Sequence, residues 1–195
     1  MHLIGLTGGV GMGKTTASNF LQQRGLPVID TDVLAREVVE PGLPAWDEIR
    51  RLFGEDITDS DGRLRRDELA RQVFAEPARR QQLEAIIHPR IRERWVAQVA
   101  LWRTEKHPAG VVVIPLLFET DAAGSFDSVI CVACSASTQR QRLLARGWTS
   151  EQIAQRIAAQ WPVEKKVGLA DYVIWNESGL EVHAEQLDRI LRFIL

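Results

Sequence analysis

The sequence predicts an α/β fold in which a parallel sheet is interrupted by a mostly helical insertion. Residues 2–7 form a short apolar run, followed by a glycine cluster, a helical pattern over 14–24 and a second apolar run over 27–30. This order of strand, glycine turn, helix and strand is a β–α–β unit, whose parallel strands need a right-handed crossover. Two β-branched runs, 111–115 and 128–133, are typical of strands that are covered on both faces.

The remaining elements are predicted from helical spacing and turn residues. Turn residues occupy 58–62, and Pro89 is expected to interrupt the longest helical stretch because proline lacks a backbone N–H. The helices predicted in the insertion cover 33–40, 45–53, 66–75, 77–87 and a longer segment after Pro89. Later helices are predicted at 137–145, 150–160 and 180–195, with a last strand at 172–175.

These elements divide the chain into three parts. The sheet core is expected from residues 1–34, 108–139 and 167–195. The helical insertion covers 35–107, and a second, arginine-bearing excursion covers 140–166.

The composition is that of an ordinary globular chain. Its 195 residues are 45% hydrophobic, and 24 basic against 26 acidic residues give a net charge of −2. This balance argues against a general nucleic-acid or membrane-surface binder. The longest apolar run, 111–118, is shorter than the roughly 20 residues of a membrane span, and the N-terminus shows no secretion signal.

The two cysteines, Cys131 and Cys134, are too few for a disulfide scaffold. Residues three apart on a strand point to opposite faces, so neither a disulfide nor a shared metal is natural for this pair. A reducing cytoplasm is the expected compartment, and a monomer or weak homo-oligomer the expected state.

The strongest chemical signal is GGVGMGKT at 8–15, which matches the G-x-x-x-x-G-K-[ST] motif between a strand and a helix. Glycines permit the backbone angles that turn successive N–H groups around an anion, and the following helix directs its positive end at the same point. Lys14 can bridge the β- and γ-phosphates of a nucleoside triphosphate, and the Thr15 hydroxyl can bind Mg²⁺, the expected cofactor. The alternative is a glycine turn that precedes a helix by chance. The ATP-binding residues predicted in this loop are Gly8, Gly9, Gly11, Met12, Gly13, Lys14, Thr15 and Thr16.

Two acids, Asp30 and Asp32, lie at the end of the second predicted strand. Ligands of α/β sheets bind beyond the carboxyl ends of the strands, so both carboxylates are expected in the same crevice as the phosphate loop. A kinase that acts on an alcohol needs a carboxylate to align the hydroxyl and take its proton. Asp32 is the candidate base, and Asp30 is the candidate for holding a Mg²⁺-bound water. A helix N-cap is the alternative for Asp32, and the two roles are compatible.

Several further segments, spread over the whole chain, form a specific pattern. They are IGLTGGVGMGKTT at 4–16, VIDTD at 28–32, AREVVEPG at 35–42, FGEDI at 53–57, DGRLRRDELARQVF at 61–74, HPRI at 88–91, IPLLFE at 114–119, RIAAQ at 156–160 and ADYVIWNESG at 170–179. A phosphate loop occurs in many families of proteins, whereas DGRLRR, HP and PLLFE in this order are specific to one family. On these motifs the chain resembles the dephospho-coenzyme A kinase family.

The resemblance implies phosphoryl transfer from ATP to the 3′-hydroxyl of the ribose of dephospho-CoA, giving CoA and ADP in the last step of CoA biosynthesis. It also implies a P-loop nucleotide-kinase core, a helical substrate-binding domain over 35–107 and a lid over 140–166. Asp32 matches the family's proposed catalytic base, and Asn176 lies where the family reads the ATP adenine; an ordinary turn residue is the alternative for Asn176. The chain departs from the family's usual serine at Met12 and from its usual alanine at Thr31.

Charge supports a lid independently of the resemblance. Between residues 136 and 166, six basic residues against two acids give a local sum of 6 − 2 = +4. A solvated helical face is one explanation. The other is a mobile cover that brings cations to the transferring phosphoryl group and excludes water. Arg140 is the candidate catalytic cation and ATP contact.

The insertion must hold a long acceptor that carries a diphosphate, an adenosine and a pantetheine arm. Arg63, Arg65 and Arg66 are the candidate diphosphate partners, because guanidinium offers a bidentate fork. His88 is a candidate substrate contact, and a buried histidine at a helix start is the alternative. The residues predicted to line the apolar part of the acceptor site are Leu69, Ile91, Leu117 and Phe118.

Two other functions compete with this interpretation. A nucleoside or nucleoside-monophosphate kinase shares the phosphate loop and differs in the size of its acceptor. A regulatory GTP switch usually carries an N-K-x-D segment, whereas the corresponding region here reads NESG at 176–179. The expected partners are therefore ATP and dephospho-CoA, with no nucleic acid and no membrane.

Overall fold

The computed structural model describes residues 1–195, apart from the side chains of residues 74 and 75. The chain forms two compact units. Residues 1–30 and 101–195 make the sheet unit, and residues 31–100 make the helical unit. Along the chain, the helical unit is thus an insertion into the sheet unit.

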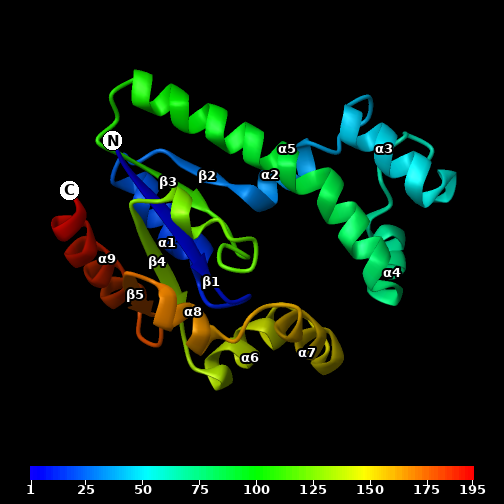
Figure 1. The fold of residues 1–195 in the computed structure, drawn as a ribbon. Helices are drawn as coiled ribbons and strands as arrows, with labels where there is room; N and C mark the ends of the chain where they lie inside the picture. Colours follow the sequence, from blue (N-terminus) through cyan, green and yellow to red (C-terminus); the bar gives the residue numbers. More distant parts are fainter. The chain divides into compact units, whose positions relative to one another are not determined.

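The sheet unit is built on five strands in the order β2-β3-β1-β4-β5 (Figure 1), and every neighbouring pair is parallel. This confirms the predicted parallel α/β fold. The strands are β1 (His2–Gly8), β2 (Val28–Asp30), β3 (Ala109–Val113), β4 (Ser128–Ala133) and β5 (Tyr172–Trp175). The helices of the unit are α1 (Lys14–Gln23), η2 (Ala123–Ser125), α6 (Ala136–Ala145), α7 (Ser150–Ala158), α8 (Val163–Leu169) and α9 (Leu180–Ile194).

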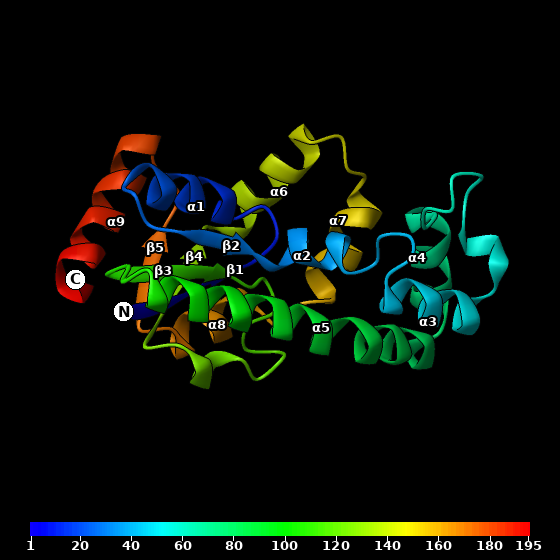
Figure 2. The same cartoon turned by 90° about the horizontal axis from the view of Figure 1, so that it is seen from above.

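Successive side chains of β1 point to opposite faces of the sheet, so the core of this unit lies on both faces. Ile4 and Leu6 are fully buried in one cluster with residues of α1 and α9, such as Leu21 and Leu187. Helices α1 and α9 lie on one face of the sheet and α8 on the other (Figures 1 and 2). On the second face, a Cβ on Gly5 would lie 2.7 Å from Leu117, so only glycine leaves room for that side chain.

The helical unit holds a core of its own. It contains α2 (Thr31–Glu37), α3 (Pro44–Phe53), η1 (Glu55–Ile57), α4 (Arg66–Ala75) and most of α5 (Pro77–Thr104). Its buried cluster consists of Val38, Val39, Ala45, Ile49, Phe53, Ile57 and Leu69. The predicted turn at 58–62 is present: Asp59 Oδ1 accepts the N–H groups of Asp61 and Arg63, at 3.0 and 2.8 Å.

The predicted interruption at Pro89 is wrong, because α5 runs continuously from Pro77 to Thr104. Proline removes one backbone hydrogen bond from a helix interior, but tertiary packing outweighs that loss here. Ile87 and Ile91, on either side of Pro89, both pack against the cluster of the helical unit. Arg90 Nη1 also donates to the Ile86 carbonyl at 2.6 Å, which supports the helix locally.

Two other helix predictions need correction. The helix expected from residue 33 begins at Thr31, directly after β2, and ends at Glu37. Helix α8 was not predicted, because its short VEKKVGL sequence shows no amphipathic repeat. None of the helices in the described chain is long and apolar enough to cross a membrane.

Candidate active site

The loop between β1 and α1 has the geometry of an anion-binding loop. Gly8, Gly11 and Gly13 adopt φ angles of 144°, 75° and 108°, which side chains disfavour. Two of these glycines also make close approaches. A Cβ on Gly8 would lie 2.1 Å from the Val132 carbonyl oxygen, and one on Gly13 would lie 2.1 Å from Asn176 Nδ2. The loop therefore requires glycine for both its backbone shape and its packing.

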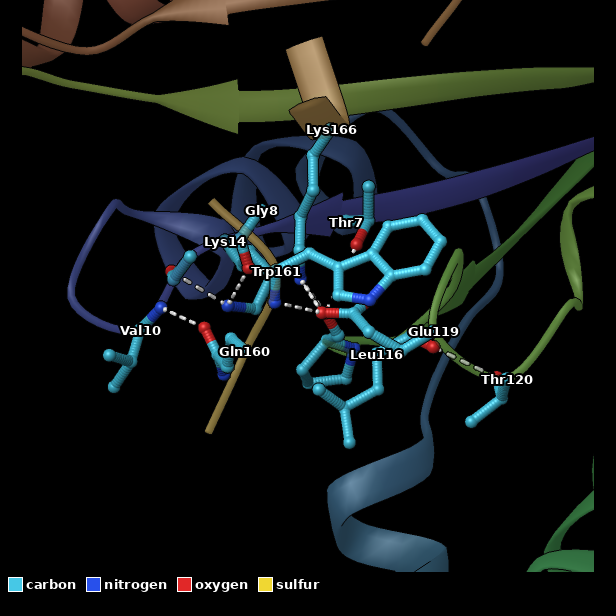
Figure 3. A network of polar contacts seen from close by, with 12 residues as sticks. Thr7, Gly8, Val10, Lys14, Leu116, Glu119, Thr120, Gln160, Trp161 and Lys166 are labelled. Carbon is cyan, nitrogen blue, oxygen red and sulfur yellow. Dashed lines mark hydrogen bonds and ion pairs between the residues drawn. The ribbon is translucent and has the colours of Figure 1, made fainter. Parts of the chain in front are cut away.

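Lys14 and Thr15 begin α1 at the end of this loop. Lys14 Nζ donates to the Gly8 and Gly9 carbonyls, at 2.8 and 3.0 Å, so its ammonium lies over the loop (Figure 3). Gly13 is the N-cap and offers no side chain to the first N–H groups of the helix. An anion can satisfy such N–H groups, and the helix dipole favours it there.

Asn176 fastens the end of β5 to the loop. Its Nδ2 donates to the Met12 carbonyl at 2.8 Å, and its backbone N–H donates to the Ala133 carbonyl at 2.7 Å. Asn176 lies in the turn that follows β5, as the alternative interpretation expected, and its side chain is buried. Met12 is buried as well, and it contributes its carbonyl to this contact.

Arg142 was not singled out from the sequence, although it is the arginine of α6 that contacts Asn176, the residue bonded to the loop. Its Nη2 donates to the Asn176 carbonyl at 2.9 Å, whereas Arg140 is exposed and donates to Ser150 Oγ at 2.8 Å. Helical spacing could have pointed to Arg142. Gln139 and Leu143 are the buried residues of α6, and Arg142 adjoins them on the same side of the helix. Arg140 lies on the exposed side.

The expected positive charge of the 140–166 segment is partly neutralised inside the protein. Lys166 is fully buried, and its Nζ lies 2.7 Å from Glu119 Oε1 and donates to the Pro115 carbonyl at 2.8 Å. Glu119 Oε1 also accepts the Trp161 N–H at 2.9 Å (Figure 3). Lys166 is therefore a structural cation rather than part of a solvated face.

Burial also controls the titration of groups near the loop. It raises the pKa of the Cys131 thiol to about 11, despite the positive charges of Lys166 and Lys14, so this cysteine is a protonated core residue. Burial lowers the pKa of His183, and the Arg142 charge lowers it further. Hydrogen bonds from Ser135 and Thr138 to its carboxylate lower the pKa of Glu177, which thereby stays ionised at the start of α6.

The two acids take different places in the secondary structure. Asp30 is the last residue of β2 and pairs in register with Val113 of β3, so it lies at the carboxyl edge of the sheet. Asp32 lies in the first turn of α2, which begins at Thr31. The N-cap expected from a helix start at residue 33 is therefore wrong.

The predicted acceptor residues of the helical unit vary in exposure. Arg63, Arg65 and Arg66 are exposed between the 58–62 turn and the first turn of α4. His88 is exposed in the middle of α5, so the alternative of a buried histidine at a helix start is wrong. Leu69 is buried in the cluster of its unit, and Ile91 packs against that cluster.

The apolar candidates of the sheet unit are also core residues. Leu117 is fully buried against Gly5, and Phe118 is buried beside it in the chain. Their placement gives them a packing role, and contact with an acceptor stays a prediction.

The oxygen ligands suited to Mg²⁺ are few. Among the described side chains, no group of three or more His, Cys, Asp or Glu residues is placed to hold a metal ion. The Thr15 hydroxyl is exposed in the first turn of α1, which fits a cation that keeps several waters and takes few protein ligands.

Comparison with known proteins agrees with this geometry. The family model described as dephospho-CoA kinase matches residues 2–181. A dephospho-CoA kinase from Bdellovibrio bacteriovorus is 39% identical over 194 residues, which cover 100% of this chain and 96% of the relative. One from Anaeromyxobacter dehalogenans is 42% identical over 192 residues, which cover 98% of this chain and 91% of the relative.

Among solved structures, TT1252 from Thermus thermophilus is similar to this chain with a TM-score of 0.87 and 34% identity, covering 100% of this chain and 98% of that one. The similarities in sequence and structure extend over both units rather than over the phosphate loop alone. The chain belongs to the dephospho-CoA kinase family.

Proposed function

We propose that the phosphate loop, Asp32 and Arg140 carry out the reaction of this family in the present chain. That reaction is the phosphorylation of dephospho-CoA to CoA, the last step of CoA biosynthesis. Family membership therefore decides against the regulatory GTP switch and the nucleoside kinase considered from the sequence. The observation that supports the residue assignment best is the loop itself: three of its glycines have positive φ, Lys14 Nζ donates to the Gly8 and Gly9 carbonyls, and the helix start has no side-chain cap.

The loop binds the phosphates of ATP. The N–H groups of residues 13–16 surround the anion, while those of Val10 and Met12 donate to Gln160 and Gly9. The ammonium of Lys14 neutralises charge between the β- and γ-phosphates. Thr15 would hold Mg²⁺ through its hydroxyl, and Asp30 through a water; the ion, when bound, further neutralises the phosphates. Asn176 maintains the loop through its contact with Met12 and is the candidate neighbour of the adenine.

Asp32 positions the 3′-hydroxyl of the acceptor ribose and takes its proton as the new phosphate ester bond forms. Along the chain, helix α1 and strand β2 lie between the loop and Asp32, which follows the last residue of β2 by two positions. In-line transfer needs this alignment more than it needs a strong base.

The exposed guanidinium groups of Arg63, Arg65 and Arg66 bind the diphosphate of the acceptor, with His88 as a further polar contact. Ile91, which is partly exposed, is the apolar candidate for contact with the remainder of the acceptor, whereas the buried Leu69, Leu117 and Phe118 act through packing within their own units. The 140–166 segment serves as the lid. Arg140 supplies positive charge to the transferring group, and closure excludes water that would otherwise hydrolyse ATP.

The decisive experiment compares Asp32→Asn with Asp47→Asn. Asp47 is an exposed acid in the first turn of α3, so both changes remove a similar favourable interaction with a helix dipole. With ATP and dephospho-CoA as substrates, we expect Asp32→Asn to lower kcat by about 100-fold to 10,000-fold, while the Kd for ATP is retained. Asp47→Asn should turn over like the unmodified enzyme.

Unchanged turnover in Asp32→Asn would remove Asp32 from the role of base. Absence of CoA formation by the unmodified chain, together with phosphorylation of a different acceptor, would contradict the proposed substrate.

A further inference from the structure

The Val10 peptide, in the middle of the phosphate loop, is held by two glutamine side chains from distant parts of the chain. Gln160 Oε1 accepts the Val10 N–H at 3.0 Å, and Gln139 Nε2 donates to the Val10 carbonyl at 2.8 Å. Figure 3 shows the Gln160 side chain directed at Val10. Both backbone polar groups of one loop residue are therefore satisfied by side chains rather than by the backbone.

The two glutamines flank the arginine-rich segment. Gln139 lies on α6, one residue before Arg140, and Gln160 follows α7 by two residues. The intervening residues, 140–159, include Arg140, Arg142, Arg146 and Arg156. This segment is thus fastened to the phosphate loop at both of its ends, and the two fastenings meet at the same residue.

Each glutamine is itself held in place. Gln139 is buried, and its Nε2 lies 3.3 Å from the position that a Cβ on Gly9 would take. Gln160 precedes Trp161, whose N–H donates to Glu119 Oε1 at 2.9 Å, and Glu119 in turn pairs with the buried Lys166. Residues 160–166 are therefore anchored to the segment that follows β3, which gives Gln160 a fixed base.

A loop rich in glycine loses more conformational freedom than any other when a ligand fixes it. Contacts that hold the loop beforehand lower this cost at the moment of binding. Val10 lies directly before Gly11, Met12 and Gly13, which lead into the N–H groups at the start of α1 that face the phosphates in the proposed function. Clamping both polar groups of Val10 fixes the peptide planes on either side of it and thereby the direction of the N–H groups that follow.

We propose that Gln139 and Gln160 are positioning residues that pre-organise the phosphate loop for ATP and couple it to the arginine-bearing segment. The proposal deepens the function given above and rests on it, because it takes ATP as the ligand of the loop. Neither glutamine touches the reacting atoms; both act through the Val10 peptide.

The test replaces Gln160 by methionine, which keeps the length of the side chain and removes the acceptor. A matched control is Gln155→Met, at an exposed position on α7. Equilibrium binding of ATP and of ADP is measured first, followed by steady-state kinetics with dephospho-CoA. We expect Gln160→Met to raise the Kd and KM for ATP roughly fivefold to tenfold, because one hydrogen bond to the loop is lost. The kcat and the KM for dephospho-CoA should change less than about threefold, and Gln155→Met should bind ATP like the unmodified chain.

A general loss of structure would lower kcat and affect both substrates, so the separation of KM from kcat distinguishes positioning from damage. Gln160→Asn serves as a second variant, because it withdraws the oxygen by one methylene and keeps the amide. An unchanged Kd for ATP in both variants would overturn the proposal, as would an equal effect of Gln155→Met. If the unmodified chain itself fails to bind ATP, the proposed function fails instead, and this outcome is distinct from the others.

Discussion

The two units of the chain differ in one ion pair: among the described residues only the sheet unit buries a pair, while its other pairs, Arg24–Asp188 and His107–Glu105, are partly exposed. The sheet unit buries an ion pair: Lys166 is fully buried, and the Glu119 side chain is 13% exposed. In the helical unit, each ion pair between described side chains leaves at least one partner more than 40% exposed. Solvent screens such pairs, and ordering their long side chains costs entropy, so they add little stability.

This difference corresponds to a difference in task. In the proposed function, the sheet unit holds backbone N–H groups in fixed directions around an anion, with the help of buried and part-buried polar contacts at Val10, Met12 and Glu119. The helical unit presents the guanidinium groups of Arg63, Arg65 and Arg66 to solvent. Solvated cations remain available to a charged ligand, whereas buried ones are already committed to protein partners.

The largest effect is expected from breaking the buried pair. Glu119→Gln leaves the Lys166 ammonium without a counter-charge, and such losses cost about 3–5 kcal/mol of the free energy of unfolding. The control in the helical unit is Glu84→Gln, which breaks the exposed pair with Arg80, a 3.2 Å contact. Its cost should stay below about 1 kcal/mol. Urea denaturation of both variants measures the difference, and equal losses would remove the contrast between the units.

An intermediate effect is expected from the exposed arginines. Arg63→Ala should raise the KM for dephospho-CoA about tenfold, because a hydrogen bond to a charged group is lost. The free energy of unfolding should stay within about 0.5 kcal/mol of the unmodified value, since the side chain is exposed. Arg51→Ala, at another exposed position of the same unit, is the control and should leave the KM unchanged. If the KM responds equally to both changes, only the general charge of the unit matters.

The smallest effect is expected from the buried His183. Burial and Arg142 lower its pKa, so the folded protein favours the neutral imidazole. Its contribution to stability is fully present above the unfolded pKa of about 6.5 and is lost as the pH falls through the lower folded pKa. In His183→Leu, the free energy of unfolding should fall less than in the unmodified chain between about pH 7 and about pH 5. The control is His88→Gln, at an exposed position, which should leave this pH dependence unchanged. If the free energy of unfolding changes equally with pH in the unmodified chain and in both variants, His183 is excluded as the source.

Local chemistry was sufficient to predict much of the fold. The bounds of β4, β5 and α4 agree with the prediction, because β-branched runs and helical spacing act over neighbouring residues. Pro89 misled the prediction because packing on both sides of it outweighs a missing hydrogen bond. The parallel sheet followed from the order of elements, whereas the strand order β2-β3-β1-β4-β5 came from the structure.

The phosphate loop was predictable without coordinates, because the GGVGMGKT motif at 8–15 stands between a short apolar run and a helical pattern. Three features became visible in the folded chain alone: Arg142 rather than Arg140 contacts Asn176, Lys166 is buried, and two glutamines hold Val10. The physical reason is separation along the chain. Gln139 and Gln160 lie 129 and 150 residues from Val10, and no local pattern shows which side chains the folded sheet will bring to one peptide.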